Sequence, residues 1–198
     1  MVKGIDAFLD VPGHMYDEEC RLLQKLAAGK IVLDIGTHYG RSAVAMAGTA
    51  LWVDTVDNYQ GDTQINPPVM AETITKIAGS GLGDKIEINQ ADFMEFLEAY
   101  GPRLQECGMI FYDGPHIPPV YEKHFLDFVI EFGYRGLVAV HDYKHWDHNM
   151  AYVVEAVDDF EKKTGRVRNG PLMKQSIVWF DALEESAKIQ KARRSSSV

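Results

Sequence analysis

The sequence predicts a doubly wound α/β fold, with a mostly parallel sheet and helices on both of its faces. Short runs rich in Val, Ile and Leu, each of strand length, recur along the chain. Helix-length segments separate these runs, and a sustained strand-helix-strand order requires right-handed crossovers and parallel strands. The length of 198 residues, with 46% hydrophobic and 25% charged residues, suits one ordinary globular domain.

The strand candidates are the apolar runs at residues 30–35, 51–56, 85–89, 109–112, 137–140 and 176–180. The helix candidates between them are residues 41–48, 68–78, 93–100, 120–132 and 151–163. Several of these helices begin at a capping residue or a proline. Asp92, directly before Phe93 and three residues ahead of Glu95, resembles a capping box built on aspartate.

The chain divides into three predicted segments. Residues 1–29 are expected to form an N-terminal helical segment, whose helix over residues 16–28 could cover a binding pocket or form a homodimer contact. Residues 30–182 are expected to form the main domain. Residues 183–198 are expected to start as a helix and to end as a disordered tail, because basic and serine residues gather there.

Charge and composition exclude several functional classes. The 20 Lys+Arg against 29 Asp+Glu leave a net charge of −9, and without a basic surplus we expect no nucleic-acid partner. No apolar run approaches the roughly 20 residues of a membrane span, and the N-terminus lacks the apolar core of a signal peptide. Cys20 and Cys107 are too isolated for a disulfide framework. We therefore expect a soluble, cytoplasmic protein without a membrane partner.

A glycine-bearing turn follows the first predicted strand. Ligands bind outside the carboxyl ends of the strands in an open α/β sheet, and here the chain reads D-I-G-T-H-Y-G-R-S over residues 34–42. Gly36 can adopt a conformation closed to other residues, and Gly40 permits close packing of a helix on the strand. The G-x-x-x-G spacing differs from the phosphate-binding fingerprint, and the Asp34 carboxylate disfavours a phosphate.

Acidic residues also follow the next two strands. Asp57 lies about 20 residues beyond the glycine turn, where a carboxylate commonly accepts hydrogen bonds from ribose hydroxyls. Asp92 could accept a hydrogen bond from the exocyclic amine of adenine. Each residue alone could be an ordinary turn residue, helix cap or solvated acid. Their order at successive strand ends favours a nucleoside site without a phosphate site.

With these residues, the chain resembles the class I S-adenosylmethionine-dependent methyltransferases over about residues 30–180. The resemblance implies a Rossmann-like methyltransferase fold with an antiparallel last strand, and S-adenosyl-L-methionine as the cofactor. The cofactor contacts that it implies are Asp34, Gly36, Gly40, Ser42, Asp57 and Asp92, with Thr37 as a further candidate.

A possible cation site follows the fourth and fifth strands. Neighbouring parallel strands lie about 4.8 Å apart, so Asp113, His141 and Asp142 can reach one point and offer two carboxylates and an imidazole to a divalent cation. Alternatively, the carboxylates bind water or cap helices and His141 packs in the core. Magnesium prefers oxygen ligands, whereas imidazole suits manganese, iron or zinc, so the identity of the metal stays open.

These two segments resemble metal-dependent small-molecule O-methyltransferases of the catechol-type and macrolide sugar subgroup. Asp113 and His116 match its D-x-x-H element, Tyr121 and Asp127 match a Tyr and an Asp on the following helix, and H-D-Y at residues 141–143 matches the last element. The chain departs from the pattern in a longer loop at residues 117–120. It also departs at His141, where catechol-type relatives carry a carboxylate.

The resemblance implies methyl transfer to an oxygen of a small hydroxylated acceptor. His116 is the expected general base, since an imidazole with a pKa of about 6.5 can take a proton at neutral pH. Asp113 is the expected catalytic carboxylate, which holds a cation that acidifies the acceptor. Two alternatives stay open: a metal-independent methyltransferase acting on an amine or carboxylate, and a non-catalytic nucleoside-binding α/β domain.

Overall fold

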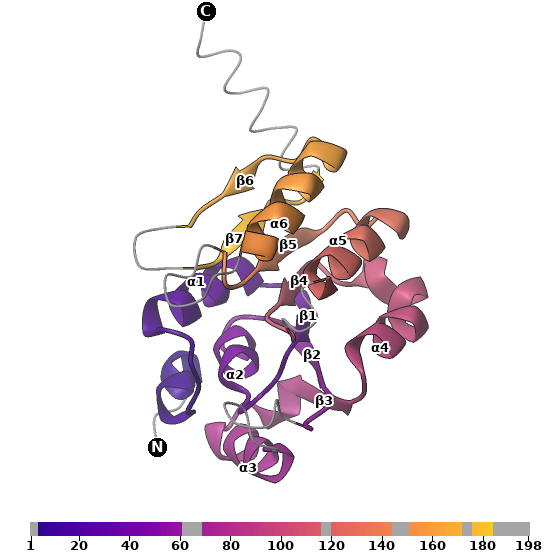
Figure 1. Cartoon of the computed structure of the whole chain (residues 1–198). Coiled ribbons are helices and arrows are strands. Elements are labelled where there is room, and N and C mark those ends of the chain that lie inside the picture. The colour runs from indigo at the N-terminus through magenta and orange to yellow at the C-terminus, as the bar shows by residue number, and fades with distance from the viewer. Residues whose placement is uncertain (1–3, 61–68, 116–119, 144–150, 172–175, 184–198) are drawn as a thin grey trace, which may run out of the picture.

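A computed structural model describes residues 4–60, 69–115, 120–143, 151–171 and 176–183 (Figure 1). Within these ranges the strands form one seven-stranded sheet in the order β3-β2-β1-β4-β5-β7-β6. The strands are β1 (Ile31–Ile35), β2 (Trp52–Asp57), β3 (Ile86–Gln90), β4 (Met109–Tyr112), β5 (Leu137–Val140), β6 (Arg168–Asn169) and β7 (Val178–Phe180).

The direction of the strands confirms the predicted fold class. Strands β1 to β5 pair in parallel, whereas β7 pairs antiparallel with both β5 and β6. The sheet is therefore mostly parallel and ends in antiparallel strands, as the resemblance implied. Because the parallel strands point the same way, their carboxyl ends meet at one edge of the sheet.

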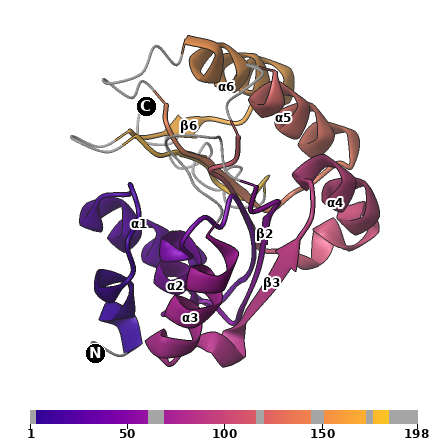
Figure 2. The ribbon, with the colours of Figure 1, turned by 60° about the horizontal axis from the view of Figure 1, so that its bottom comes forward.

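Two layers of helices cover the sheet, one on each face (Figures 1 and 2). One layer contains η1 (Gly4–Asp10), α1 (Asp17–Ala27), α2 (Arg41–Ala47) and α3 (Met70–Ser80). The other contains α4 (Phe93–Tyr100), α5 (Tyr121–Glu131) and α6 (Ala151–Thr164). The short 3-10 helices η2 (Gly83–Lys85) and η3 (Gly101–Glu106) lie in the connections. In the part of the chain that the structure describes, no helix is long and apolar enough to cross a membrane.

The core consists of two apolar clusters, one under each helix layer. Strand β4 shows the division: Met109 and Phe111 belong to the cluster beneath α1 and α2, whereas Ile110 and Tyr112 belong to the cluster beneath α4 to α6. This alternation follows from the two-residue period of a strand. Burial of each large apolar side chain contributes about 1.5–3 kcal/mol, so both faces hold the strand ends in place.

Element boundaries differ from the predicted ones at a few places. Strand β6 was not predicted, because its two residues, Arg168 and Asn169, are polar and form no apolar run. The last strand begins at Val178 instead of residue 176, and α3 lies about two residues later than its predicted range. The predicted terminal helix lies almost entirely outside the described residues.

One arginine links the N-terminal segment to the turn after β1. The Arg41 guanidinium, at the start of α2, donates hydrogen bonds to the carbonyl oxygens of Phe8, Val11 and Met15 at 3.1, 2.6 and 3.1 Å. It also pairs with Asp17 at the start of α1. Arg41 directly follows the glycine turn, so the entry into α1 is tied to that turn.

Candidate functional site

The first residues beyond three strands are held in register at the carboxyl edge. The amide of Gly36 donates to the Val56 carbonyl at 2.9 Å, and the amide of Asp113 donates to the Ile35 carbonyl at 2.8 Å. The amide of His141 donates to the Tyr112 carbonyl at 2.9 Å. The sheet ladder thus continues past the strands and fixes the glycine turn beside the residues that follow β4 and β5.

The turn after β1 requires glycine at residue 36. Gly36 has a φ of 98°, and a Cβ added there would lie 1.9 Å from the carbonyl oxygen of Asp113. A side chain would therefore be strained by its own backbone and would collide with the neighbouring strand end. Gly40 is the N-cap of α2 with a φ of 87°. The turn brings the backbone of β1 against that of β4.

Asp34 is a buried carboxylate beneath this turn. Its side chain is 0% exposed, and its Oδ2 accepts hydrogen bonds from the hydroxyls of Ser42 at 3.0 Å and Thr55 at 2.9 Å. Its Oδ1 accepts no hydrogen bond from any described residue. Burial raises the pKa of Asp34 to about 8, although both hydroxyls oppose that increase. Oδ1 can therefore accept a hydrogen bond from a ligand, and the ionised carboxylate can pair with a positive charge on a ligand.

Asp57 lies opposite the same turn, at the end of β2. One carboxylate oxygen accepts from the His38 amide at 2.9 Å and the other accepts from the Tyr59 amide at 2.7 Å. His38 and Tyr59 both adopt positive φ angles, of 46° and 56°. Asp57 thus holds two strained loop residues in place. Each carboxylate oxygen has a second lone pair, which leaves acceptor capacity for ribose hydroxyls.

Asp92 is the N-cap of α4. Its carboxylate accepts hydrogen bonds from the amides of Met94 at 2.9 Å and Glu95 at 3.3 Å, as the sequence predicted for a cap. The side chain is exposed at the same edge of the sheet, beyond β3. Both interpretations of Asp92, as a helix cap and as an adenine contact, are compatible with this position.

Asp113, His141 and Asp142 come together at the ends of β4 and β5, as predicted. One ligand atom from each lies within 4.8 Å of the other two. The Nδ1 atom of His141 is 3.1 Å from Oδ1 of Asp113 and 3.2 Å from Oδ1 of Asp142. Asp142 has a φ of 57°, so its backbone is held in a conformation that is unfavourable for most residues.

The contacts at Nδ1 have the distances of ion pairs but not the angles of hydrogen bonds. Nδ1 is buried, and no described residue forms a hydrogen bond with it. Both carboxylates therefore approach the atom away from the direction in which a ring N–H would point. Two carboxylates and an imidazole grouped in this way fit a divalent cation. The donor set is thus chemically suited to the metal that the sequence suggested.

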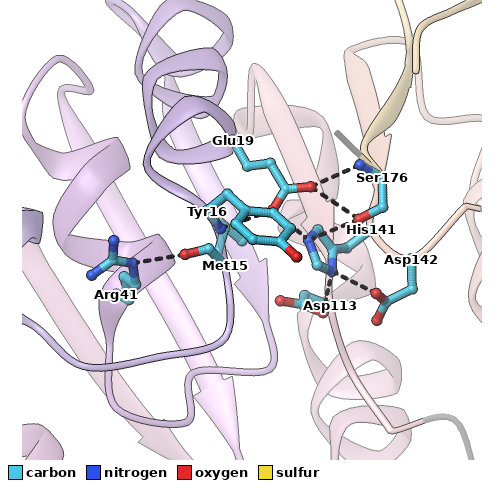
Figure 3. A network of polar contacts seen from close by, with 8 residues as sticks. All are labelled: Met15, Tyr16, Glu19, Arg41, Asp113, His141, Asp142 and Ser176. Atoms are coloured by element: carbon cyan, nitrogen blue, oxygen red, sulfur yellow. Dashed lines mark hydrogen bonds and ion pairs between the residues drawn. The ribbon is translucent and has the colours of Figure 1, made fainter. Parts of the chain in front are cut away.

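The other ring nitrogen of His141 contacts residues outside this group. Nε2 lies 3.3 Å from Oε2 of Glu19 and 3.2 Å from Oγ of Ser176 (Figure 3). Burial alone would lower the pKa of His141, but the neighbouring carboxylates of Asp113, Asp142 and Glu19 raise the pKa well above its ordinary value. The ring therefore lies between carboxylates on both sides.

Glu19 and Ser176 were not identified from the sequence. Glu19 is one of three acidic residues in the first turn of α1, a pattern that usually indicates favourable interaction with the helix dipole. Ser176 directly precedes the apolar part of the last predicted strand. Both residues are recognisable only from the folded structure, because the hydrogen bond between them joins positions 157 residues apart.

Two residues implied by the O-methyltransferase resemblance do not join this group. Asp127 is on the surface, where its Oδ1 accepts from the Lys163 ammonium at 2.8 Å. Tyr121 packs edge-on against Phe93, with 5.2 Å between the ring centroids. His116 and the histidine-rich segment at residues 144–150 lie outside the described residues.

No protein-family model and no curated protein matches this chain. Its fold is similar to that of an O-methyltransferase from Bacillus cereus in complex with S-adenosylhomocysteine, at 15% identity and a TM-score of 0.64, covering 89% of this chain and 87% of that one. It is also similar to precorrin 8w decarboxylase from Methanobacterium thermoautotrophicum, at 16% identity and a TM-score of 0.62, covering 92% and 100%. An rRNA methylase from Streptococcus thermophilus aligns at 15% identity and a TM-score of 0.57, covering 86% and 98%.

These similarities identify the fold as that of the class I S-adenosylmethionine-dependent methyltransferases, which confirms the resemblance seen in the sequence at the level of fold. At such low identity, they do not identify the acceptor. The names of the similar proteins point to different acceptors, since one is an O-methyltransferase and another is an rRNA methylase.

Proposed function

We propose that this protein is an S-adenosylmethionine-dependent methyltransferase that methylates an oxygen of a small hydroxylated molecule with the help of a divalent cation. The observation that carries the proposal is the buried Nδ1 of His141, which lies near two carboxylates without hydrogen-bond geometry. This group directly adjoins the glycine turn, because Gly36 packs on the backbone of Asp113. A methyl donor and a cation-bound acceptor could therefore meet at this edge.

The residues around the turn would hold the cofactor. S-adenosyl-L-methionine supplies a methyl group on a sulfonium, which is ready for in-line displacement. Asp34, with its unused Oδ1, and the backbone at Gly36 and Gly40 would line the methionyl part, with Ser42 orienting Asp34. Asp57 would accept from the ribose, and Asp92 would border the adenine. These acceptors suit a positively charged nucleoside that carries no phosphate.

The residues after β4 and β5 would hold the cation. Asp113, His141 and Asp142 provide two oxygen ligands and one nitrogen ligand, a mixture compatible with manganese or other transition metals and, less favourably, with magnesium. A cation there would lower the pKa of an acceptor hydroxyl. This effect would be largest for acceptors with two adjacent oxygens, such as catechols and vicinal diols, because both oxygens can bind the cation.

The transfer needs one proton to leave the acceptor. We assign its removal to His116, which the sequence puts three residues beyond Asp113. The acceptor proton passes to the imidazole, and an oxygen lone pair forms the new bond to the methyl carbon. The bond between that carbon and sulfur breaks, and its electron pair stays on sulfur to give neutral S-adenosylhomocysteine. The protein's main contribution is alignment and proton removal.

A metal-independent methyltransferase acting on an amine or a carboxylate is the second candidate. The same contacts favour it in one respect, because Asp113, Asp142 and Glu19 could neutralise a protonated His141 without any metal. The imidazolium would then have a structural role. The third candidate, a non-catalytic nucleoside-binding domain, would bind the cofactor but transfer no methyl group.

Two measurements separate these candidates. Calorimetric titration with S-adenosylhomocysteine should show binding that Asp57→Ala weakens by about 10- to 100-fold, as expected for the loss of hydrogen bonds to a charged group. Absence of binding by the wild-type protein would overturn the methyltransferase proposal as a whole. Methyl transfer to a panel of catechols and vicinal diols should require added Mn²⁺ or Mg²⁺ and stop with a chelator. Transfer that survives chelation unchanged would exclude the cation and favour the second candidate.

A further inference from the structure

A buried carboxylate from the N-terminal segment reaches the candidate cation site. Glu19, on α1, is 1% exposed. Its Oε1 accepts from the amide of Ser176 at 2.7 Å and from the hydroxyl of the same residue at 3.0 Å. Its Oε2 accepts from the Tyr16 amide at 3.0 Å and contacts Nε2 of His141 at 3.3 Å (Figure 3). A carboxylate that only capped α1 could stay at the surface, as Asp17 and Glu18 do.

The chemistry of these contacts determines which nitrogen of His141 carries the proton. An ionised carboxylate only accepts hydrogen bonds, and the two amides beside Glu19 only donate. Nε2 must therefore carry a hydrogen to form a favourable contact with Oε2. In neutral imidazole the other nitrogen is then an unprotonated acceptor, the form that binds a metal. A cation bound beside Asp113 and Asp142 would take the place of the hydrogen on Nδ1, while Nε2 would keep its hydrogen toward Glu19.

We infer that Glu19 is a positioning residue for the cation site: its carboxylate keeps neutral His141 protonated at Nε2 and directs Nδ1 toward the cation. The inference rests on the cation in the proposed function. Carboxylates commonly orient a metal-binding histidine in this way, and their loss weakens metal binding by about 10- to 100-fold. The N-terminal segment is then part of the site instead of only a cover for it.

The position of Glu19 is linked to the glycine turn that follows β1. Arg41 immediately follows Gly40, and its guanidinium binds the carbonyl of Met15 at 3.1 Å, just ahead of α1. The Arg41 side chain also pairs with Asp17, two residues before Glu19. The same turn that would hold the cofactor therefore fixes the start of the helix that supports His141.

The test measures metal binding without catalysis. Binding of Mn²⁺ to the full chain can be followed by calorimetry and by the electron paramagnetic resonance signal of free Mn²⁺. Glu19→Gln should weaken Mn²⁺ binding by about 10- to 100-fold, while affinity for S-adenosylhomocysteine changes by less than about 3-fold. Glu18→Gln is the matched control, because Glu18 is an exposed carboxylate directly beside Glu19 on the same helix. It should leave Mn²⁺ affinity within about 3-fold of the wild type.

A second measurement does not depend on how well the variant folds. In the wild-type protein, ¹⁵N resonances of the His141 ring with added Zn²⁺ should show hydrogen on Nε2 and metal on Nδ1. The opposite assignment, or a ring protonated on both nitrogens in the presence of metal, would overturn the inference.

The outcomes also separate this inference from the proposed function. Wild-type Mn²⁺ binding that Asp142→Asn abolishes but Glu19→Gln leaves unchanged would overturn the role of Glu19 alone. Wild-type protein that binds neither Mn²⁺ nor Zn²⁺ would overturn both the cation and the role of Glu19. In that case, S-adenosylhomocysteine binding would still support the methyltransferase proposal.

Discussion

The two halves of the strand-end edge hold their polar side chains in different ways. In the proposed cofactor half, formed by the glycine turn with Asp34 and Asp57, the carboxylates accept hydrogen bonds from residues between 38 and 59. In the proposed cation half, formed by Asp113, His141 and Asp142, Glu19 and Ser176 contact the His141 ring from far away in the chain. The first half is organised locally and the second by tertiary packing.

This difference has consequences for what each half can tolerate. Asp57 supports two loop residues with positive φ angles, so its removal should disturb the local backbone and cofactor binding together. The carboxylates of Asp113 and Asp142 group around Nδ1 of His141 without forming a hydrogen bond with it. Changes in the cation half should therefore affect metal binding more than they affect the fold.

The largest effect is expected where the two halves touch. Gly36→Ala puts a methyl group 1.9 Å from the Asp113 carbonyl oxygen at a positive φ. Combined steric and backbone strain should lower the free energy of unfolding by about 3–5 kcal/mol, as measured by urea denaturation. Gly81→Ala is the control, because Gly81 has a φ of 75° but no atom within 4 Å of an added Cβ. It should cost about 1 kcal/mol.

If the free energy of unfolding falls by the same amount in both glycine variants, the close contact between the ends of β1 and β4 is not the reason that residue 36 must be glycine. If Gly36→Ala stays fully stable, the two halves are not packed as closely as the geometry at Gly36 indicates.

Asp142→Asn should impair the cation half and leave the cofactor half unchanged. Asparagine tolerates the φ of 57° found at this position, so the backbone should be retained while the negative charge is lost. We expect methyl transfer to a diol acceptor to fall by about 100-fold and Mn²⁺ binding to weaken strongly. S-adenosylhomocysteine affinity, measured by calorimetry, should be unchanged. An equal loss of cofactor affinity would mean that the two halves form a single binding unit.

Asp34 gives the cofactor half a distinct pH dependence. Its pKa of about 8 in the folded protein exceeds the ordinary value of 3.8, so between these values the folded state holds a proton that the unfolded chain releases. This contribution to the stability of the cofactor-free protein is therefore present below about pH 4 and is lost as the pH rises to about 8. Asp34→Asn should reduce this loss of stability with rising pH by on the order of 2 kcal/mol.

Thermal unfolding of both proteins between about pH 5 and pH 8.5 measures this effect, with Asp127→Asn, which removes a surface carboxylate, as the control for a change of charge. Parallel curves for wild type and Asp34→Asn would show that Asp34 ionises normally and that a ligand is not needed to neutralise it.

The contrast between the halves also explains what could be predicted from the sequence. Apolar runs gave the bounds of β4 and β5 as observed, because fully buried strands consist of continuous apolar residues. Asp34 and Asp57 were identifiable because the turn and the strand ends that define them are close in sequence. The grouping of Asp113, His141 and Asp142 followed from the spacing of parallel strands alone.

Glu19 could not be predicted in this way. Asp17, Glu18 and Glu19 all lie in the first turn of α1, and Glu19 also accepts the capping hydrogen bond from the Tyr16 amide, so a role in helix initiation already accounts for all three in the sequence. Strand β6 was missed for a related reason, since its pairing with β7 depends on neighbours and not on its own polar residues.

The smallest effect is expected at Asp127, which lies outside both halves. It forms surface ion pairs with Lys123 and Lys163, and exposed pairs of this kind contribute little because water screens them. Asp127→Asn should shift the melting temperature by no more than about 2 °C and leave methyl transfer and Mn²⁺ binding unchanged. Lys163→Gln should produce a shift of similar size. A loss of transfer with Asp127→Asn alone would put this carboxylate in the site, as the O-methyltransferase resemblance implied, and would extend the cation half onto α5.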